Sequence, residues 1–295
     1  MNKEYRYFKY STSSSSIKLE KGENYIFNKI EGLTESEVDL HLLNFSNYAG
    51  GRYTGHKQQA REIVVEGHIV GLRANPNSLR KDLINCFNPS NGLGTIEIKM
   101  WDGKTYTIDA ICMNLLIKDN TVVKDIKEFQ ATFYCPSPYF KGEKQYYSFS
   151  EKESKFQFPF HIDLDNDNSL IFGEYGGNNE KQIYNEGNVE TPFIINIYGE
   201  SVAPIMLINE TTGDFIEIDT DIKADEVIEI STYHSDKYCI KKTSFGNENV
   251  FEYMNFNSKF FNLKTGINKL RFLTGNAEAE RNTIELEFHN LYNGI

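Results

Sequence analysis

Just before its midpoint the chain reads Phe133-Tyr134-Cys135-Pro136-Ser137-Pro138-Tyr139-Phe140. Upstream of this stretch, polar and apolar residues alternate from Glu128 to Phe133, which is the period of a half-buried β-strand. Pro136 and Pro138 then remove two backbone donors and favour extended backbone in the residues before them. The stretch therefore predicts that a strand ends at the prolines and that a straight, stiff joint follows, with one domain over residues 1–140 and another over residues 141–295.

The composition is that of a β-rich globular protein. Hydrophobic residues make up 39% of the 295 residues and aromatic residues 14%, whereas prolines number only 7. This length allows about two domains that each bury a core. The formal net charge of −11 argues against a nucleic-acid-binding protein, because phosphate contacts need clustered Lys and Arg.

The cysteines indicate neither a metal site nor a disulfide framework. All four are far apart in the sequence and no C-x-x-C pair is present, so we expect core thiols at Cys86, Cys112, Cys135 and Cys239. The N-terminus has no apolar h-region, and no run approaches ~18 apolar residues. We therefore expect no signal peptide, no membrane span and synthesis in the cytoplasm.

The first half of the chain predicts strands around one helix. That helix is expected from about Pro76 to Phe87, with Asn75 as its cap and apolar residues at four-residue spacing. A hairpin is predicted around Asp102-Gly103. Residues 1–10 suggest an edge strand or arm, residues 31–43 either a short helix or a strand, and residues 44–57 a sharp loop, because the loop's glycines permit positive φ. Together these elements predict an α+β domain, split-barrel or sandwich-like.

The second half shows no helical period. Short strands are expected at residues 156–162, 193–198, 204–208, 215–218, 227–230, 238–241, 269–272 and 283–289, separated by Gly- and Asn-rich turns. Many short strands at this spacing predict an antiparallel β-sandwich, so the chain as a whole is expected to be mainly β.

Signals for chemistry are weak. The segment Gly50 to Lys57 has the glycine spacing of a phosphate-binding loop but does not match it further. Such a loop needs a Ser or Thr directly after the lysine and then a helix, whereas here Gln58 and a predicted strand follow. Calcium-loop spacing is present in one acidic segment, with carboxylates at Asp163, Asp165, Asp167 and Glu174, but its flanks favour a solvated acidic loop over a calcium site. No catalytic motif is present, so we expect no enzyme and no cofactor.

Several landmarks follow one another along the chain: the aromatic N-terminus, Gly50-Gly51-Arg52-Tyr53 before a strand, the single helix, the proline joint, residues 185–193, residues 209–213 and residues 260–268. Their order and spacing resemble those of the distal tail proteins (Dit) of siphophages, a siphovirus-type tail component family. Asn188 departs from the aspartate expected at that turn. The resemblance spans nearly the whole chain.

The resemblance implies a structural adaptor at the tail tip of a virion. Its N-terminal domain, residues 1–140, would form a hexameric, tail-tube-like ring, and residues 141–295 a galectin-like sandwich or jelly roll. The implied partners are further copies of the chain, the tail tube protein, the tail hub or tail-associated lysin and a receptor-binding protein.

Candidate residues for the ring contact lie in the glycine-rich segment. Tyr48, Gly50, Gly51, Arg52 and Tyr53 combine side chains favoured at interface centres with turn glycines, although an ordinary exposed loop is an equal alternative. Pro136 and Pro138 are the candidates for the interdomain joint. A different class of function, a carbohydrate-binding module that contacts cell-wall glycans, also fits a sandwich rich in Tyr and Phe.

Overall fold

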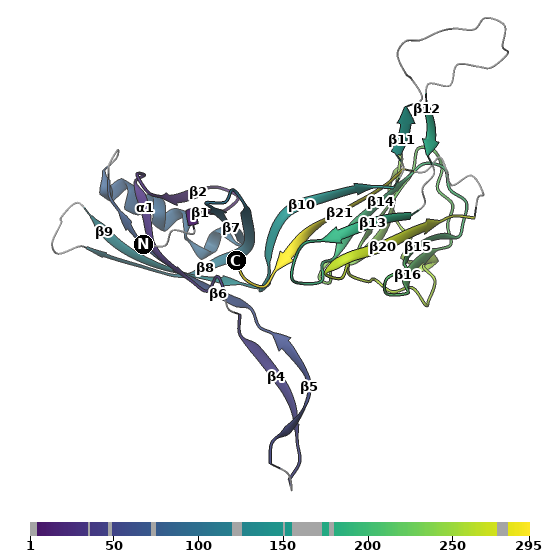
Figure 1. Ribbon diagram of the computed structural model, residues 1–295. Coiled ribbons are helices and arrows are strands. Elements are labelled where there is room, and N and C mark those ends of the chain that lie inside the picture. Colours follow the sequence, from purple (N-terminus) through teal and green to yellow (C-terminus); the bar gives the residue numbers. More distant parts are fainter. Residues whose placement is uncertain are drawn as a thin grey trace, which may run out of the picture. The chain divides into compact units, whose positions relative to one another are not determined.

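The computed structural model describes residues 5–34, 36–46, 49–71, 75–119, 126–149, 151–154, 173–176, 180–275 and 283–295. These residues form mainly antiparallel β-strands and one α-helix, as the sequence predicts (Figure 1). The chain divides into two units, Met1–Glu143 with Leu291–Ile295, and Lys144–Asn290. No described helix has the length and apolar character that a membrane crossing needs.

The first unit contains strands β1 to β9, one α-helix and a short 3-10 helix. Their bounds are β1 Tyr5–Ser11, β2 Ser16–Glu20, β3 Tyr25–Glu31, β4 Val38–Asn44, β5 Gly51–Gln58, β6 Arg61–Ile69, α1 Pro76–Cys86, η1 Pro89–Asn91, β7 Gly94–Met100, β8 Thr105–Asp119 and β9 Lys127–Cys135.

Strand β8 is long enough to take part in two sheets of this unit. Its first half pairs with β7, which continues to β1 and β2, and its second half pairs with β9, which continues to β6 and β3. The alternating apolar residues of these strands face one core. Four aromatic rings meet there at centroid distances of 4.8 to 5.8 Å, those of Phe8, Tyr10, Phe87 and Phe133.

Helix α1 forms where the sequence predicts it. The Asn75 side chain accepts a hydrogen bond from the Asn77 amide at 2.9 Å, and Pro76 takes the first helical position. Leu79 and Leu83 are buried against the core. The cap and the four-residue apolar spacing thus fix both the start and the buried face of the helix.

Two predictions for the first half are wrong. The N-terminal strand β1 is not an edge strand, because it pairs with β2 on one side and with β7 on the other. Residues 44–57 are not simply a loop, because Gly51 to Lys57 belong to β5, which pairs with β4. In the preceding segment, residues 38–44 adopt the strand alternative.

The second unit contains the following strands, the first and last of which it shares with the first unit: β10 Phe140–Ser148, β11 Glu151–Ser154, β12 Gly173–Gly176, β13 Glu180–Asn185, β14 Phe193–Tyr198, β15 Ile205–Asn209, β16 Asp214–Ile218, β17 Val227–Ser231, β18 Tyr238–Thr243, β19 Gly246–Asn249, β20 Gly266–Leu273 and β21 Thr283–Tyr292. A short 3-10 helix, η2, spans Phe251–Tyr253. The strand predicted at residues 156–162 lies outside the described residues.

Two antiparallel sheets form a sandwich in this unit. One contains the order β19-β18-β17-β14-β21, and the other has the order β13-β20-β15-β16. Inward-facing residues of both sheets share one core, including Phe193 of β14, Leu207 of β15 and Phe288 of β21. The sandwich predicted from evenly spaced short strands is confirmed.

The last residues of the chain belong to the first unit, which the sequence did not predict. Tyr292 packs edge to face on Tyr106 with ring centroids 5.2 Å apart. The Ile295 amide donates to the Leu33 carbonyl at 3.1 Å. These contacts assign residues 291–295 to the first unit and not to a domain spanning 141–295.

All four cysteines are buried and free, as predicted. Burial raises the pKa of Cys112, Cys135 and Cys239 to about 12 and also raises the pKa of Cys86. The thiols are therefore protonated and unreactive in the folded chain at neutral pH.

We expect the free energy of unfolding to fall as the pH rises from about 8 to about 11. An exposed thiol titrates near ~8.5, so in this range the unfolded chain loses protons that the folded chain keeps, and alkali favours unfolding. The denaturant midpoint measured across this range tests the trend. A variant with Cys112 and Cys239 replaced by alanine should show a shallower decline, and an identical decline in that variant would contradict the thiol origin.

Candidate interfaces on the two units

The hairpin β4–β5 extends away from the rest of the first unit (Figure 1). Every residue of β4 is exposed, and β5 is exposed except for half-buried Gly55 and Gln58. The structure describes no other strand that pairs with either one. A lone two-stranded hairpin is marginally stable in water. Its length and exposure therefore indicate a segment that is completed by another surface.

The two faces of the hairpin differ in chemistry, since paired residues lie on the same face. One face carries the pairs Leu40–His56 and Leu42–Tyr53, preceded by Val38. The other face carries Asp39–Lys57 and Leu43–Arg52. The exposed fractions of Leu40, Leu42 and Tyr53 are 61%, 51% and 55%. We call the face formed by Val38, Leu40, Leu42, Tyr53 and His56 the apolar face.

Local contacts explain why this segment folds as a hairpin. Gly50 has φ +92 at the turn, in the region that favours glycine. A register shift between His41 and Leu42 admits Thr54 as an extra residue, and its hydroxyl donates to the His41 carbonyl at 2.9 Å. The bulge keeps Tyr53 on the same face as Leu42. At the base, the Gln59 amide donates to the Glu37 carbonyl at 2.9 Å.

The predicted interface residues do not all fall on one surface. Tyr53 is on the apolar face, Arg52 is on the opposite face, and Gly50 and Gly51 lie at the turn. Tyr48 lies outside the described residues. Sequence reasoning missed the leucines of β4, although the alternation of Val38, Leu40 and Leu42 is a signal that could have found them.

The proline stretch connects β9 to β10 and belongs to the first unit. The boundary between the two units lies further along the chain, between Glu143 and Lys144. Buried Arg61 holds the stretch: its Nε donates to the Pro138 carbonyl at 2.9 Å, and its Nη1 to the Gly32 carbonyl at 2.6 Å. Pro136 is exposed. The prolines end the ladder as predicted, and Pro138 is anchored to the core of the first unit.

Arg61 also binds the end of the chain. Its Nη2 donates to the Asn293 carbonyl, and the guanidinium lies 4.9 Å from the centre of the Phe140 ring. The side chain is only 1% exposed, and burial lowers its pKa. One cation therefore joins β6, the proline stretch and the C-terminal residues.

Exposed aromatic side chains are frequent along residues 245–256 of the second unit. Phe245 and Phe256 are 99% and 101% exposed, and Phe251 and Tyr253 are about half exposed. Phe251 stacks on Phe260 with ring centroids 5.6 Å apart. These residues follow or flank β19, the edge strand of its sheet. We call this set the aromatic surface.

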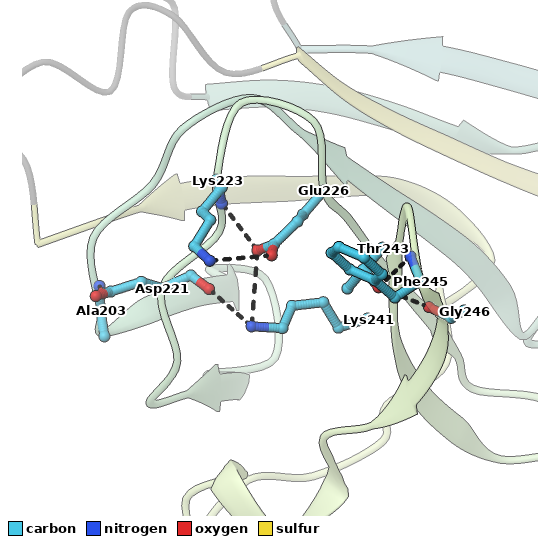
Figure 2. A network of polar contacts seen from close by, with 8 residues as sticks. All are labelled: Ala203, Asp221, Lys223, Glu226, Lys241, Thr243, Phe245 and Gly246. Atoms are coloured by element: carbon cyan, nitrogen blue, oxygen red, sulfur yellow. Dashed lines mark hydrogen bonds and ion pairs between the residues drawn. The ribbon is translucent and has the colours of Figure 1, made fainter.

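Two sets of polar contacts lie on β18 and on the turn after it, which carries Phe245 (Figure 2). Nearly buried Glu226 lies 3.8 Å from the Lys223 ammonium and 3.7 Å from the Lys241 ammonium, and Lys241 donates to the Asp221 carbonyl at 3.3 Å. At the turn, the Phe245 amide donates to the Thr243 hydroxyl at 3.2 Å. The ion pairs thus fasten β18 to the neighbouring loop, and Phe245 faces solvent from an ordered turn.

Metal-binding clusters are not found among the described residues. The calcium loop weighed from the sequence cannot be compared, because Asp163, Asp165 and Asp167, and the side chain of Glu174, lie outside what the structure describes.

Comparison with known proteins bears on both units. The family model of the siphovirus-type tail component, C-terminal domain (SPP1_Dit), matches residues 186–292. Residues 186–292 are therefore similar to a siphovirus-type tail component domain. This tail component domain coincides with most of the second unit, and the resemblance to distal tail proteins indicated by the sequence is confirmed. No curated protein matches the chain.

Solved structures show that the likeness of fold extends beyond the tail component domain. The Dit protein (gp 19.1) of phage SPP1, described as a paradigm of the hub adsorption apparatus of phages that infect Gram-positive bacteria, is 12% identical with a TM-score of 0.64. The match covers 96% of this chain and 98% of that one. A chain of the phage P2 baseplate in its activated conformation with calcium is 14% identical with a TM-score of 0.52, over 96% and 97% of the two chains. The fold of both units is therefore that of phage tail-tip proteins.

Proposed function

We propose that this chain is a structural distal tail protein that forms a homo-hexameric ring at the tip of a phage tail or a phage-derived tail. The ring serves as an adaptor between the tail tube and the hub of the adsorption apparatus. The tail component domain and the likeness of fold over nearly the whole chain support the class of protein. The observation that carries the ring is the exposed β4–β5 hairpin with its apolar face.

The hairpin favours assembly for an energetic reason. Moving one leucine or aromatic side chain of the apolar face out of water stabilises a contact by about 1.5–3 kcal/mol. The apolar face carries Leu40, Leu42 and Tyr53. A chain that keeps this face in water lacks the stabilisation that burying these side chains would give. When one surface of a subunit binds a different surface of the next, a suitable rotation closes a ring. The hairpin provides one of these surfaces.

The proposed partners follow from this placement. The ring would bind the tail tube protein on one side and the tail hub or tail-associated lysin on the other, and the second unit would offer a surface to a receptor-binding protein. The net charge of −11 suits a ring through which DNA passes without adhering, because like charges repel. The role is structural and not catalytic.

Electron microscopy tests the proposal directly. The purified chain at high concentration should form closed rings of six subunits with a central hole. Deleting its gene from the genome that encodes it should give tails without complete tips, and a plasmid copy should restore them. Normal tails with complete tips in the deletion strain would refute the adaptor role.

A second candidate function, binding of cell-wall carbohydrate, is favoured by the aromatic surface. Phe251 lines a pocket of 240 Å³ together with polar residues that include Asn247, Asn249, Glu248 and Lys237. Aromatic rings and hydrogen-bonding groups side by side are suited to sugar rings. A glycan array probed with the full chain distinguishes this function, since an adaptor without sugar binding gives no signal.

A further inference from the structure

A groove lined by both apolar and polar side chains lies beside helix α1 in the first unit. It encloses 630 Å³ and is lined by α1, by the residues that follow the helix and by the second half of β8. Ile84, Met113 and Leu116 in this lining are 38%, 50% and 47% exposed. Exposed apolar side chains in a concave surface can contribute to a binding surface when a partner covers them. We call this surface the α1–β8 groove.

The α1–β8 groove follows the edge of a strand. Six consecutive residues, Cys112 to Ile117, line it. Because successive side chains of a strand point to opposite faces, all six can border one groove only where it runs along the edge. In this part of the chain β8 pairs with β9, and the described strands leave its other side unpaired. The groove therefore offers backbone donors and acceptors as well as apolar side chains.

The apolar face of the hairpin matches the groove in chemistry and in length. Its leucines and Tyr53 are complementary to Ile84, Met113 and Leu116. Six residues of β8 span ~20 Å and the seven residues of β4 span ~23 Å. The hairpin can thus cover the groove along its whole length.

The hairpin of the same subunit does not lie beside the α1–β8 groove. Within the first unit the hairpin extends on the side away from α1 (Figure 1). We propose, building on the ring described above, that the α1–β8 groove receives the β4–β5 hairpin of a second copy of this chain. The contact is heterologous, since the hairpin of each copy meets the groove of the next.

Disulfide cross-linking of the full-length chain tests this contact. Leu40→Cys is placed on the apolar face and Met113→Cys in the groove, and the rings are oxidised with copper phenanthroline. We expect a ladder of covalent oligomers on non-reducing gels. A mixture of the two single-cysteine variants should stop at the dimer, because each copy then has one reactive partner. The native cysteines are buried, so the unaltered chain serves as the blank.

A matched pair of variants shows which face of the hairpin docks. The variant with His41→Cys and Met113→Cys has its hairpin thiol one residue after Leu40, on the opposite face. A disulfide needs Cβ atoms about 4 Å apart. This pair should therefore give about tenfold less cross-linked product than the pair of Leu40→Cys and Met113→Cys. Equal yields from the two pairs would overturn the proposal.

Two further outcomes separate this inference from the proposed function. In one outcome, rings form and Met113→Cys links to Lys29→Cys on β3, but Leu40→Cys and Met113→Cys do not link. The β8 edge would then contact β3 of the neighbouring copy. The proposed docking of the hairpin would be wrong, whereas the proposed ring would stand. A concentrated chain that stays monomeric by light scattering and forms no link would overturn both the docking and the self-assembled ring.

Discussion

Leu42→Glu should abolish assembly of the chain, whereas Leu43→Glu should leave it nearly intact. The two leucines are neighbours with almost equal exposure, 51% and 50%, but they lie on opposite faces of the hairpin. Glutamate at residue 42 loses the burial of a leucine and places a carboxylate in an apolar contact. Together these effects weaken each contact by about 4 kcal/mol, or roughly a thousandfold.

Light scattering at several protein concentrations measures this difference. The mass of the Leu42→Glu variant should stay that of a monomer at concentrations where the parent and the Leu43→Glu variant assemble. Both residues are exposed in the single chain, so neither change should lower the melting temperature of the monomer, and circular dichroism provides that control. Assembly that is equally weakened by both variants would show that the faces of the hairpin are not distinguished.

Arg61→Met should destabilise the first unit by about 3–5 kcal/mol, which lowers its melting temperature by about 10 °C. Methionine fills similar space but leaves the carbonyls of Gly32, Pro138 and Asn293 without the guanidinium that binds them. A buried carbonyl that loses its donor keeps the cost of desolvation. The loss therefore exceeds that of an ordinary surface substitution.

Differential scanning calorimetry resolves the effect by unit. The transition of the first unit should shift, while that of the second should not, because the described contacts of Arg61 lie within the first unit. Arg80→Met on the exposed side of α1 is the matched control and should change stability by less than about 0.5 kcal/mol. A shift of equal size in both variants would contradict the role assigned to Arg61.

Much of the fold follows from local patterns in the sequence. Helix α1 was predictable because a cap, an N-terminal proline and a four-residue apolar period agree. Strands β14, β16 and β17 were predictable because apolar alternation and flanking turns coincide. These signals depend only on residues close together in the chain.

The candidate interface was harder to predict, for the opposite reason. Gly51 to Tyr53 read as a loop because two glycines dominate the local signal, and the pairing with β4 that makes a strand depends on residues across the turn. The assignment of residues 291–295 was also not predictable, since it rests on Arg61 and Tyr106, which are far away in sequence. Contacts between residues far apart in the sequence produce no periodic pattern of apolar residues.

The return of residues 291–295 to the first unit has a consequence for synthesis. The ribosome makes residues 144–290 before it makes the residues that complete the first unit. A nascent chain that has not reached Tyr292 leaves Arg61 without one of its three carbonyls and lacks the Tyr292 ring that packs on Tyr106. A prematurely terminated chain therefore has an incomplete first unit, and this is the unit that we propose forms the ring.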